Sequence, residues 1–144
     1  MTIADTLDRR PLTETGEPTD HFTQRGGIAC AGEHLHLDLH GCDPAALSDP
    51  ARIEACLREG AVATGAHILF GHFHHFGPEQ GVTGVLVLAE SHVSIHSWPE
   101  RGFAAVDVFV CGDCDPSAAR TAIERGLGST SAEATLHLRG TGVV

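Results

Sequence analysis

The chain has 144 residues, of which 42% are hydrophobic, and it carries a formal net charge of −10. This length suits one domain with a single modest core, and the negative charge argues against a nucleic-acid-binding protein, which normally carries a basic patch. No stretch approaches the roughly 20 apolar residues needed to cross a bilayer, and the N-terminus lacks the apolar core of a secretory signal. We therefore expect a cytoplasmic protein whose five cysteines are thiols.

The first predicted elements follow a polar N-terminal segment. Residues 1–31 show no apolar period, which predicts a flexible extension ahead of a single domain over 32–144. Leucines that alternate with polar residues predict a half-buried strand from residue 33 to residue 40. Asp49 and Pro50 are typical of the N-cap and first position of a helix, and this helix is expected to end at residue 65.

The rest of the chain predicts mainly strands. The run over 84–89 is continuously apolar, which is typical of a buried central strand. The order strand, helix, three strands, helix, strand predicts an α+β fold: a two-layer sandwich of a mainly antiparallel sheet with two helices on one face. The expected later elements are strands over residues 66–73, 84–89, 103–111 and 132–138, and a helix from residue 116 to about residue 126.

The segment from Leu88 to Glu100 carries the residues best suited to chemistry. It follows the apolar run with two serines, two histidines and a carboxylate, and polar groups at the end of a rigid strand are well placed for a site. A serine near a histidine first suggests a hydrolase. However, Ser91 has no Gly-x-Ser-x-Gly motif around it, which makes an ordinary esterase a poor interpretation.

Two motifs in this region carry a resemblance to a known family. Ala-Glu-Ser-His-x-x-Ile-His-x-Trp-Pro-Glu over 89–100, with Ala-Ala-Val-Asp-Val-Phe-x-Cys-Gly over 104–112, resembles the bacterial S-adenosylmethionine decarboxylase proenzymes. The resemblance runs from about residue 33 to the C-terminus. It implies that the chain cleaves itself between Glu90 and Ser91, which gives residues 1–90 and a second chain that begins with a pyruvoyl group.

The resemblance implies roles in this maturation. The Ser91 hydroxyl attacks the Glu90 carbonyl, and Thr83 stands where the family usually has a serine hydroxyl that assists this step. A base matching His96 then removes the Ser91 α-proton, and elimination and hydrolysis leave the pyruvoyl group as a covalent cofactor. Its ketone forms a Schiff base with the substrate amine and accepts the electrons released with carbon dioxide.

The resemblance also implies how a mature carboxy-lyase of this family works. Cys111 is the acid that protonates the decarboxylated product, Glu100 binds the ribose hydroxyls of S-adenosylmethionine, and Phe76 stacks on its adenine. The product supplies aminopropyl groups for polyamine (spermidine) synthesis. Family members of this size form dimers of the processed αβ unit with active sites near the interface, so we expect a homo-oligomer without a metal, nucleic acid or membrane partner.

Two departures from the family pattern keep other functions open. The chain reads Phe-Gly-Pro-Glu-Gln-Gly over 76–81, one residue longer than the usual Phe-x-Pro-Gln-Gly, and His40 stands where an aromatic ring commonly precedes Gly-Cys. Because both changes affect the expected adenosyl pocket, a pyruvoyl-dependent decarboxylase of ornithine or arginine is the first alternative. The second is a non-enzymatic zinc-binding module, since Cys111 and Cys114 have metal-pair spacing. Imidazoles for such a site are offered by His72, His74 and His75.

Overall fold

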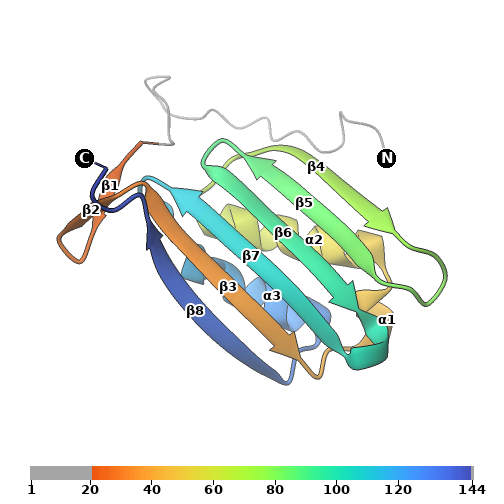
Figure 1. Cartoon of the computed structure of the whole chain (residues 1–144). Coiled ribbons are helices and arrows are strands. Elements are labelled where there is room, and N and C mark those ends of the chain that lie inside the picture. Colours follow the sequence, from red (N-terminus) through yellow and green to blue (C-terminus); the bar gives the residue numbers. More distant parts are fainter. Residues whose placement is uncertain (1–20, 144) are drawn as a thin grey trace.

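The computed structural model describes residues 21–143 and consists mainly of a six-stranded sheet with helices on one face (Figure 1). The strand order is β4-β5-β6-β7-β3-β8, and every neighbouring pair is antiparallel. The predicted fold class is therefore confirmed. The strands are β3 (Gly32–His40), β4 (Ile68–His75), β5 (Val82–Leu88), β6 (Ser91–Trp98), β7 (Phe103–Cys111) and β8 (Ser131–Arg139). The helices are α1 (Pro44–Leu47), α2 (Pro50–Ala63) and α3 (Arg120–Leu127), with 3₁₀ turns η2 (Pro99–Arg101) and η3 (Pro116–Ala119).

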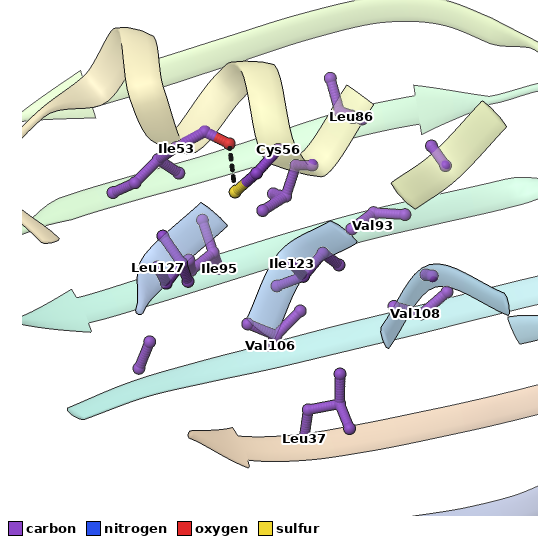
Figure 2. Packing of buried hydrophobic residues seen from close by; sticks show 14 of the residues in the cluster. Leu37, Ile53, Cys56, Leu86, Val93, Ile95, Val106, Val108, Ile123 and Leu127 are labelled. Carbon is purple, nitrogen blue, oxygen red and sulfur yellow. Dashed lines mark hydrogen bonds between the residues drawn. The ribbon is translucent and has the colours of Figure 1, made fainter. Parts of the chain in front are cut away.

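The core lies between the sheet and the helices, as Figure 2 shows. Along each central strand, apolar side chains alternate with polar ones, so that the apolar set faces the helices. Ile53 and Leu57 of α2 and Ile123 and Leu127 of α3 are fully buried against this face. Burying each such side chain contributes about 1.5–3 kcal/mol. The helices therefore cover only one face of the sheet.

The other face of the sheet, which we call the open face, is not covered by any helix of the described residues (Figure 1). Its side chains include several histidines and aromatic rings. Val87 of β5 and Trp98 of β6 are each 40% exposed on this face in the single chain. None of the helices within residues 21–143 is both long and apolar enough to span a bilayer.

Strand β6 corrects the sequence prediction. The segment after Glu90 was expected to be a polar stretch at the end of a strand, but Ser91–Trp98 forms a strand of its own between β5 and β7. Val93 and Ile95 point into the core, whereas His92 and Ser94 lie on the open face. His92, Ser94 and His96 therefore occupy every second position of a half-buried strand, which is a period-two pattern, whereas Ser97 is buried on the core side.

The N-terminal part also differs from the prediction. No regular structure was expected before residue 32, yet β1 (Thr23–Arg25) and β2 (Ile28–Cys30) form an antiparallel hairpin. Gly26 and Gly27 connect the strands with φ values of 57° and 82°, and a two-residue turn of this kind favours glycine because φ is positive at both positions. Residues 1–20, the rest of the predicted extension, lie outside the described residues.

Truncation of Ile123 tests the packing of α3 on the sheet. We expect Ile123→Ala to lower the free energy of unfolding by about 2–5 kcal/mol, because a fully buried side chain leaves a cavity when it is shortened. Urea unfolding followed by circular dichroism measures this, in chains that carry Ser91→Ala so that they stay in one piece. The exposed Thr121→Ala change in the same helix serves as control and should stay within about 0.5 kcal/mol. Equal stability of both variants would contradict the packing described.

Candidate active site

The junction between Glu90 and Ser91 lies in the tight turn between β5 and β6. Leu88 pairs with Ser91, so only Ala89 and Glu90 lie between the paired positions. Ser91 has φ 130°, and Glu79 is the only other non-glycine residue within 21–143 with a positive φ. A conformation of this kind costs of order 1–3 kcal/mol and persists only where the surroundings enforce it. The predicted cleavage point is therefore a strained backbone position.

Strand β7 brings Cys111 to this junction from 20 residues away. Because Ser91 pairs with Val110, the end of β7 lies beside the start of β6. The Cys111 Sγ is 3.1 Å from the Ser91 Oγ, and the Cys111 backbone N–H donates to the Glu90 carbonyl oxygen at 2.8 Å. The Cys111 thiol thus contacts the Ser91 hydroxyl, and the Cys111 N–H contacts the Glu90 carbonyl. These are the two groups that self-cleavage would join.

The Glu90 side chain is anchored inside the protein. Its carboxylate is 0% exposed and accepts the His67 backbone N–H at 2.8 Å on one oxygen and the His67 ring Nδ1 at 2.9 Å on the other. Sequence reasoning missed His67, because a single histidine just before β4 does not stand out among 11 histidines. Only the fold shows that it meets a residue 23 positions later.

A second group of predicted site residues lies at the other end of β6. The Thr83 Oγ1 is 3.0 Å from the His96 Nδ1, as expected from the pairing of these two residues across β5 and β6. They line a pocket of about 200 Å³ together with Phe76, Gln80, Gly81, Ser97, Trp98 and Glu100. Four predicted side chains from three separate segments therefore meet in one hollow.

Two aromatic side chains, Phe76 and Trp98, line this pocket. The Trp98 ring is stacked with that of His96 at a centroid distance of 6.0 Å and with that of Phe103 at 5.5 Å. The loop after β4 is closed where the Phe76 N–H donates to the Gly81 carbonyl at 3.0 Å. Although this loop is one residue longer than the family pattern, Phe76 still reaches the pocket, where its side chain is 61% exposed.

The two groups do not meet within one chain. Ser91 and His96 are five positions apart along β6, which corresponds to about 16 Å along a strand. Cys111 lies with Ser91, whereas Glu100 and Phe76 lie with His96. Each group therefore holds only part of the predicted machinery.

The structure does not bring together the residues of the zinc-binding alternative based on Cys111 and Cys114: within residues 21–143, the only cluster of three or more potential ligands is His34, His36 and Asp107. The His72 and His74 side chains are exposed on edge strand β4, and the His75 Nε2 is bonded to the Ser48 hydroxyl. Burial, with a smaller contribution from the Glu90 charge, raises the pKa of the Cys114 thiol to about 11, which disfavours the thiolate that binds metals.

A cluster of two histidines and an aspartate on the sheet has the composition of a metal site. The potential ligand atoms of His34, His36 and Asp107 lie within 4.8 Å of one another. The Arg139 guanidinium donates to the His34 Nδ1 at 3.0 Å, so the neutral His34 ring carries its proton on Nε2, 3.3 Å from an Asp107 oxygen. Burial lowers the pKa of His34, which favours this neutral form. The His34 Nε2 atom therefore carries a hydrogen and has no free lone pair to offer a metal ion.

Comparisons with known proteins indicate the family of the chain. The family described as S-adenosylmethionine decarboxylase matches residues 33–140. The chain is 43% identical over 110 residues to the S-adenosylmethionine decarboxylase proenzyme of Thermosipho africanus, covering 76% of this chain and 84% of that protein. It is 51% identical over 82 residues to the proenzyme of the same name from Caldanaerobacter subterraneus subsp. tengcongensis, covering 57% of this chain and 65% of that protein. The aligned stretch thus spans less than two thirds of this second relative.

A solved structure shares the fold as well. The crystal structure of the adenosylmethionine decarboxylase from Aquifex aeolicus VF5 aligns with a TM-score of 0.66 and 38% identity, covering 76% of this chain and 90% of that chain. Family match, relatives and fold therefore agree, and the matched residues include both ends of β6. The chain belongs to the S-adenosylmethionine decarboxylase family.

Proposed function

We propose that this chain is the proenzyme of a pyruvoyl-dependent S-adenosylmethionine decarboxylase. The single observation that carries the proposal is the 3.1 Å contact between the Ser91 hydroxyl and the Cys111 thiol at a junction whose backbone is strained. Family membership supports the same activity, because the matched family and the similar proteins carry this name.

The uncleaved junction suits an attack of Ser91 on the preceding carbonyl. The Ser91 Oγ forms a bond to the Glu90 carbonyl carbon, the C–N bond breaks, and the hydroxyl proton passes to the freed nitrogen, so that an ester replaces the peptide. Negative charge develops on the Glu90 oxygen during this step. The Cys111 N–H already donates to that oxygen at 2.8 Å, and a donor placed in advance stabilises such charge effectively.

The later maturation steps need a base for the Ser91 α-proton. Its removal expels the Glu90 carboxylate and leaves a dehydroalanine, which water converts to a pyruvoyl group with release of ammonia. His96 is the base that we assign, since its Nδ1 contacts Thr83 at 3.0 Å, which fixes the ring. His96 lies at the far end of β6, so it does not serve the Ser91 of its own chain.

The residues at the junction fit a pyruvoyl group in the place of Ser91. The half-buried Cys111 thiol lies beside this position. When formed, the group supplies an electrophilic carbonyl that draws in the electrons released with carbon dioxide. The Cys111 thiol is the group that would then donate a proton to the product.

The pocket at the other end of β6 favours an adenosyl substrate. Flat rings of Phe76 and Trp98 line it, and aromatic faces stack well on a purine base. The Glu100 carboxylate lines the same pocket and offers two acceptor oxygens for a pair of neighbouring hydroxyls. Ornithine and arginine have neither a ring nor a ribose, so they leave these groups unused.

A second copy of the chain would complete the site. In a two-fold dimer the same surface meets itself, so packing of the open faces with antiparallel β6 strands sets the Ser91 end of one chain over the His96 end of its partner. Trp98 and Val87 of this face are each 40% exposed in the single chain, and such a dimer buries them. We therefore propose two composite sites, each made by both chains.

Replacement of Ser91 tests self-cleavage. The unaltered protein should give two fragments, residues 1–90 and 91–144, whereas Ser91→Ala should remain a single chain of 15.1 kDa because it lacks the attacking hydroxyl. Denaturing mass spectrometry distinguishes these masses. Ser94→Ala, on the open face of the same strand, is the control and should cleave normally. Cleavage of the Ser91→Ala chain would refute the assignment of the nucleophile.

Replacement of Cys111 separates turnover from cleavage. We expect Cys111→Ala to cleave but to release carbon dioxide from carboxyl-labelled S-adenosylmethionine at least about 100-fold more slowly, because the proton donor is missing. Cys42→Ala removes a buried thiol elsewhere and should keep its activity. Release of carbon dioxide from ornithine or arginine alone would contradict the proposed substrate.

Mixing of two inactive variants tests the composite site. Cys111→Ala and Glu100→Gln damage different ends of β6, so a mixed dimer has one site with both changes and one site with neither. Random co-expression should therefore restore about a quarter of the activity of the unaltered protein. Co-expression of Cys111→Ala with Cys111→Ser provides the control without recovery. No recovery in the first mixture, with dimers present, would mean that each site belongs to a single chain.

A further inference from the structure

The buried pair of Glu90 and His67 has no part in the chemistry described so far. A carboxylate that is 0% exposed is unusual in a protein unless it is paired, and both donors to this one come from a single residue. Its backbone carbonyl is the one that Ser91 would attack. The side chain and the scissile bond thus belong to the same residue, so an anchor on one restrains the other.

His67 holds the turn between β5 and β6 in three ways. Its backbone N–H and its ring Nδ1 bond the two carboxylate oxygens of Glu90 at 2.8 and 2.9 Å, and its carbonyl accepts the Ala89 N–H at 2.9 Å. An ionised carboxylate only accepts hydrogen bonds, so the ring Nδ1 is the donor. Both residues of the turn are therefore fixed to the segment just before β4.

On the other side of the turn, Cys111 fixes the Glu90 carbonyl. Its N–H donates to this oxygen at 2.8 Å, so Glu90 is held through its side chain by the segment before β4 and through its backbone by the end of β7. Ser91 follows directly with φ 130°. A strained residue persists only where its neighbours enforce the conformation, and the two anchors on Glu90 are the contacts that do so immediately before it.

We infer that His67 is a positioning residue for self-cleavage: it clamps the Glu90 side chain and so keeps the Glu90 carbonyl oriented for attack by the Ser91 hydroxyl. The inference rests on the proposed self-cleavage and adds a residue to it. Without the clamp, the turn relaxes toward ordinary backbone angles, and the hydroxyl and carbonyl lose their alignment. A small misplacement of reacting atoms is enough to slow a reaction about 100-fold.

The test compares two replacements of His67 that differ in one hydrogen bond. His67→Leu removes the ring donor, whereas His67→Asn places an amide donor near the position of Nδ1. In full-length protein made by cell-free synthesis, the rate at which the two fragments appear is followed by denaturing mass spectrometry. We expect His67→Leu to slow cleavage by about 10-fold or more and His67→Asn to restore most of the rate.

A control separates positioning from general stability. Thr64→Val removes a buried hydroxyl, which donates to the Ala61 carbonyl and accepts the Ala66 N–H, but it leaves both His67 donors to Glu90 in place. Urea unfolding of each variant in the Ser91→Ala background gives its stability. Thr64→Val should cleave at the normal rate even where its stability falls as far as that of His67→Leu. Equal slowing of both variants would mean that cleavage only follows stability, which overturns the inference.

A second pair of variants approaches the clamp from Glu90, should His67→Leu not fold. Glu90→Gln keeps an oxygen for the His67 N–H and offers an amide N–H to the ring Nδ1 once the ring proton lies on Nε2. Glu90→Ala removes both contacts, so only Glu90→Ala should slow cleavage strongly. Normal cleavage by His67→Leu or Glu90→Ala would refute the clamp alone. An unaltered chain that never cleaves would instead refute the proposed function together with the inference.

Discussion

The pairing of β6 with β7 is the constraint on which the proposed site depends. Ser91 pairs with Val110, and this register places the Cys111 thiol and N–H against the junction. The register follows from the core, because Val93 and Ile95 must face the helices and a shift by one residue would turn them outward. The apolar alternation that stabilises the sheet thus also sets the geometry of the nucleophile. A core substitution that alters the β6–β7 register would therefore also alter the position of Cys111 relative to the junction.

The same extended strand explains why one chain does not make a whole site. A strand separates residues five positions apart by about 16 Å, so Ser91 and His96 occupy opposite ends of β6. Packing of helices on one face leaves the other free for a second copy. In the proposed dimer, a two-fold axis through the open face lets each chain supply one end of β6 to each site. Oligomerisation would then be part of the chemistry and not only of stability.

Much of the fold could be predicted from local patterns. The cap at Asp49, which bonds the N–H groups of Ala51 and Arg52, and the alternation in β3 and β7 identify their elements directly. Strand β6 was missed because its polar residues drew attention as a motif. Thr83 and His96, to which the family resemblance assigns roles in the same maturation, lie in contact across β5 and β6, although the sequence did not predict that contact. His67 could not be predicted, because its partner lies 23 residues away and no local pattern indicates that contact.

In the proposed maturation, a strained serine, two anchors on the preceding residue and a neighbouring thiol act together, and Ser91 becomes a ketone when the chain is cut. Mass spectrometry of the fragment from residue 91 onward, before and after borohydride treatment, tests this most directly. We expect a fragment without a free amino group that gains two hydrogen atoms on reduction. An intact chain, or a fragment that begins with an ordinary serine, would contradict it.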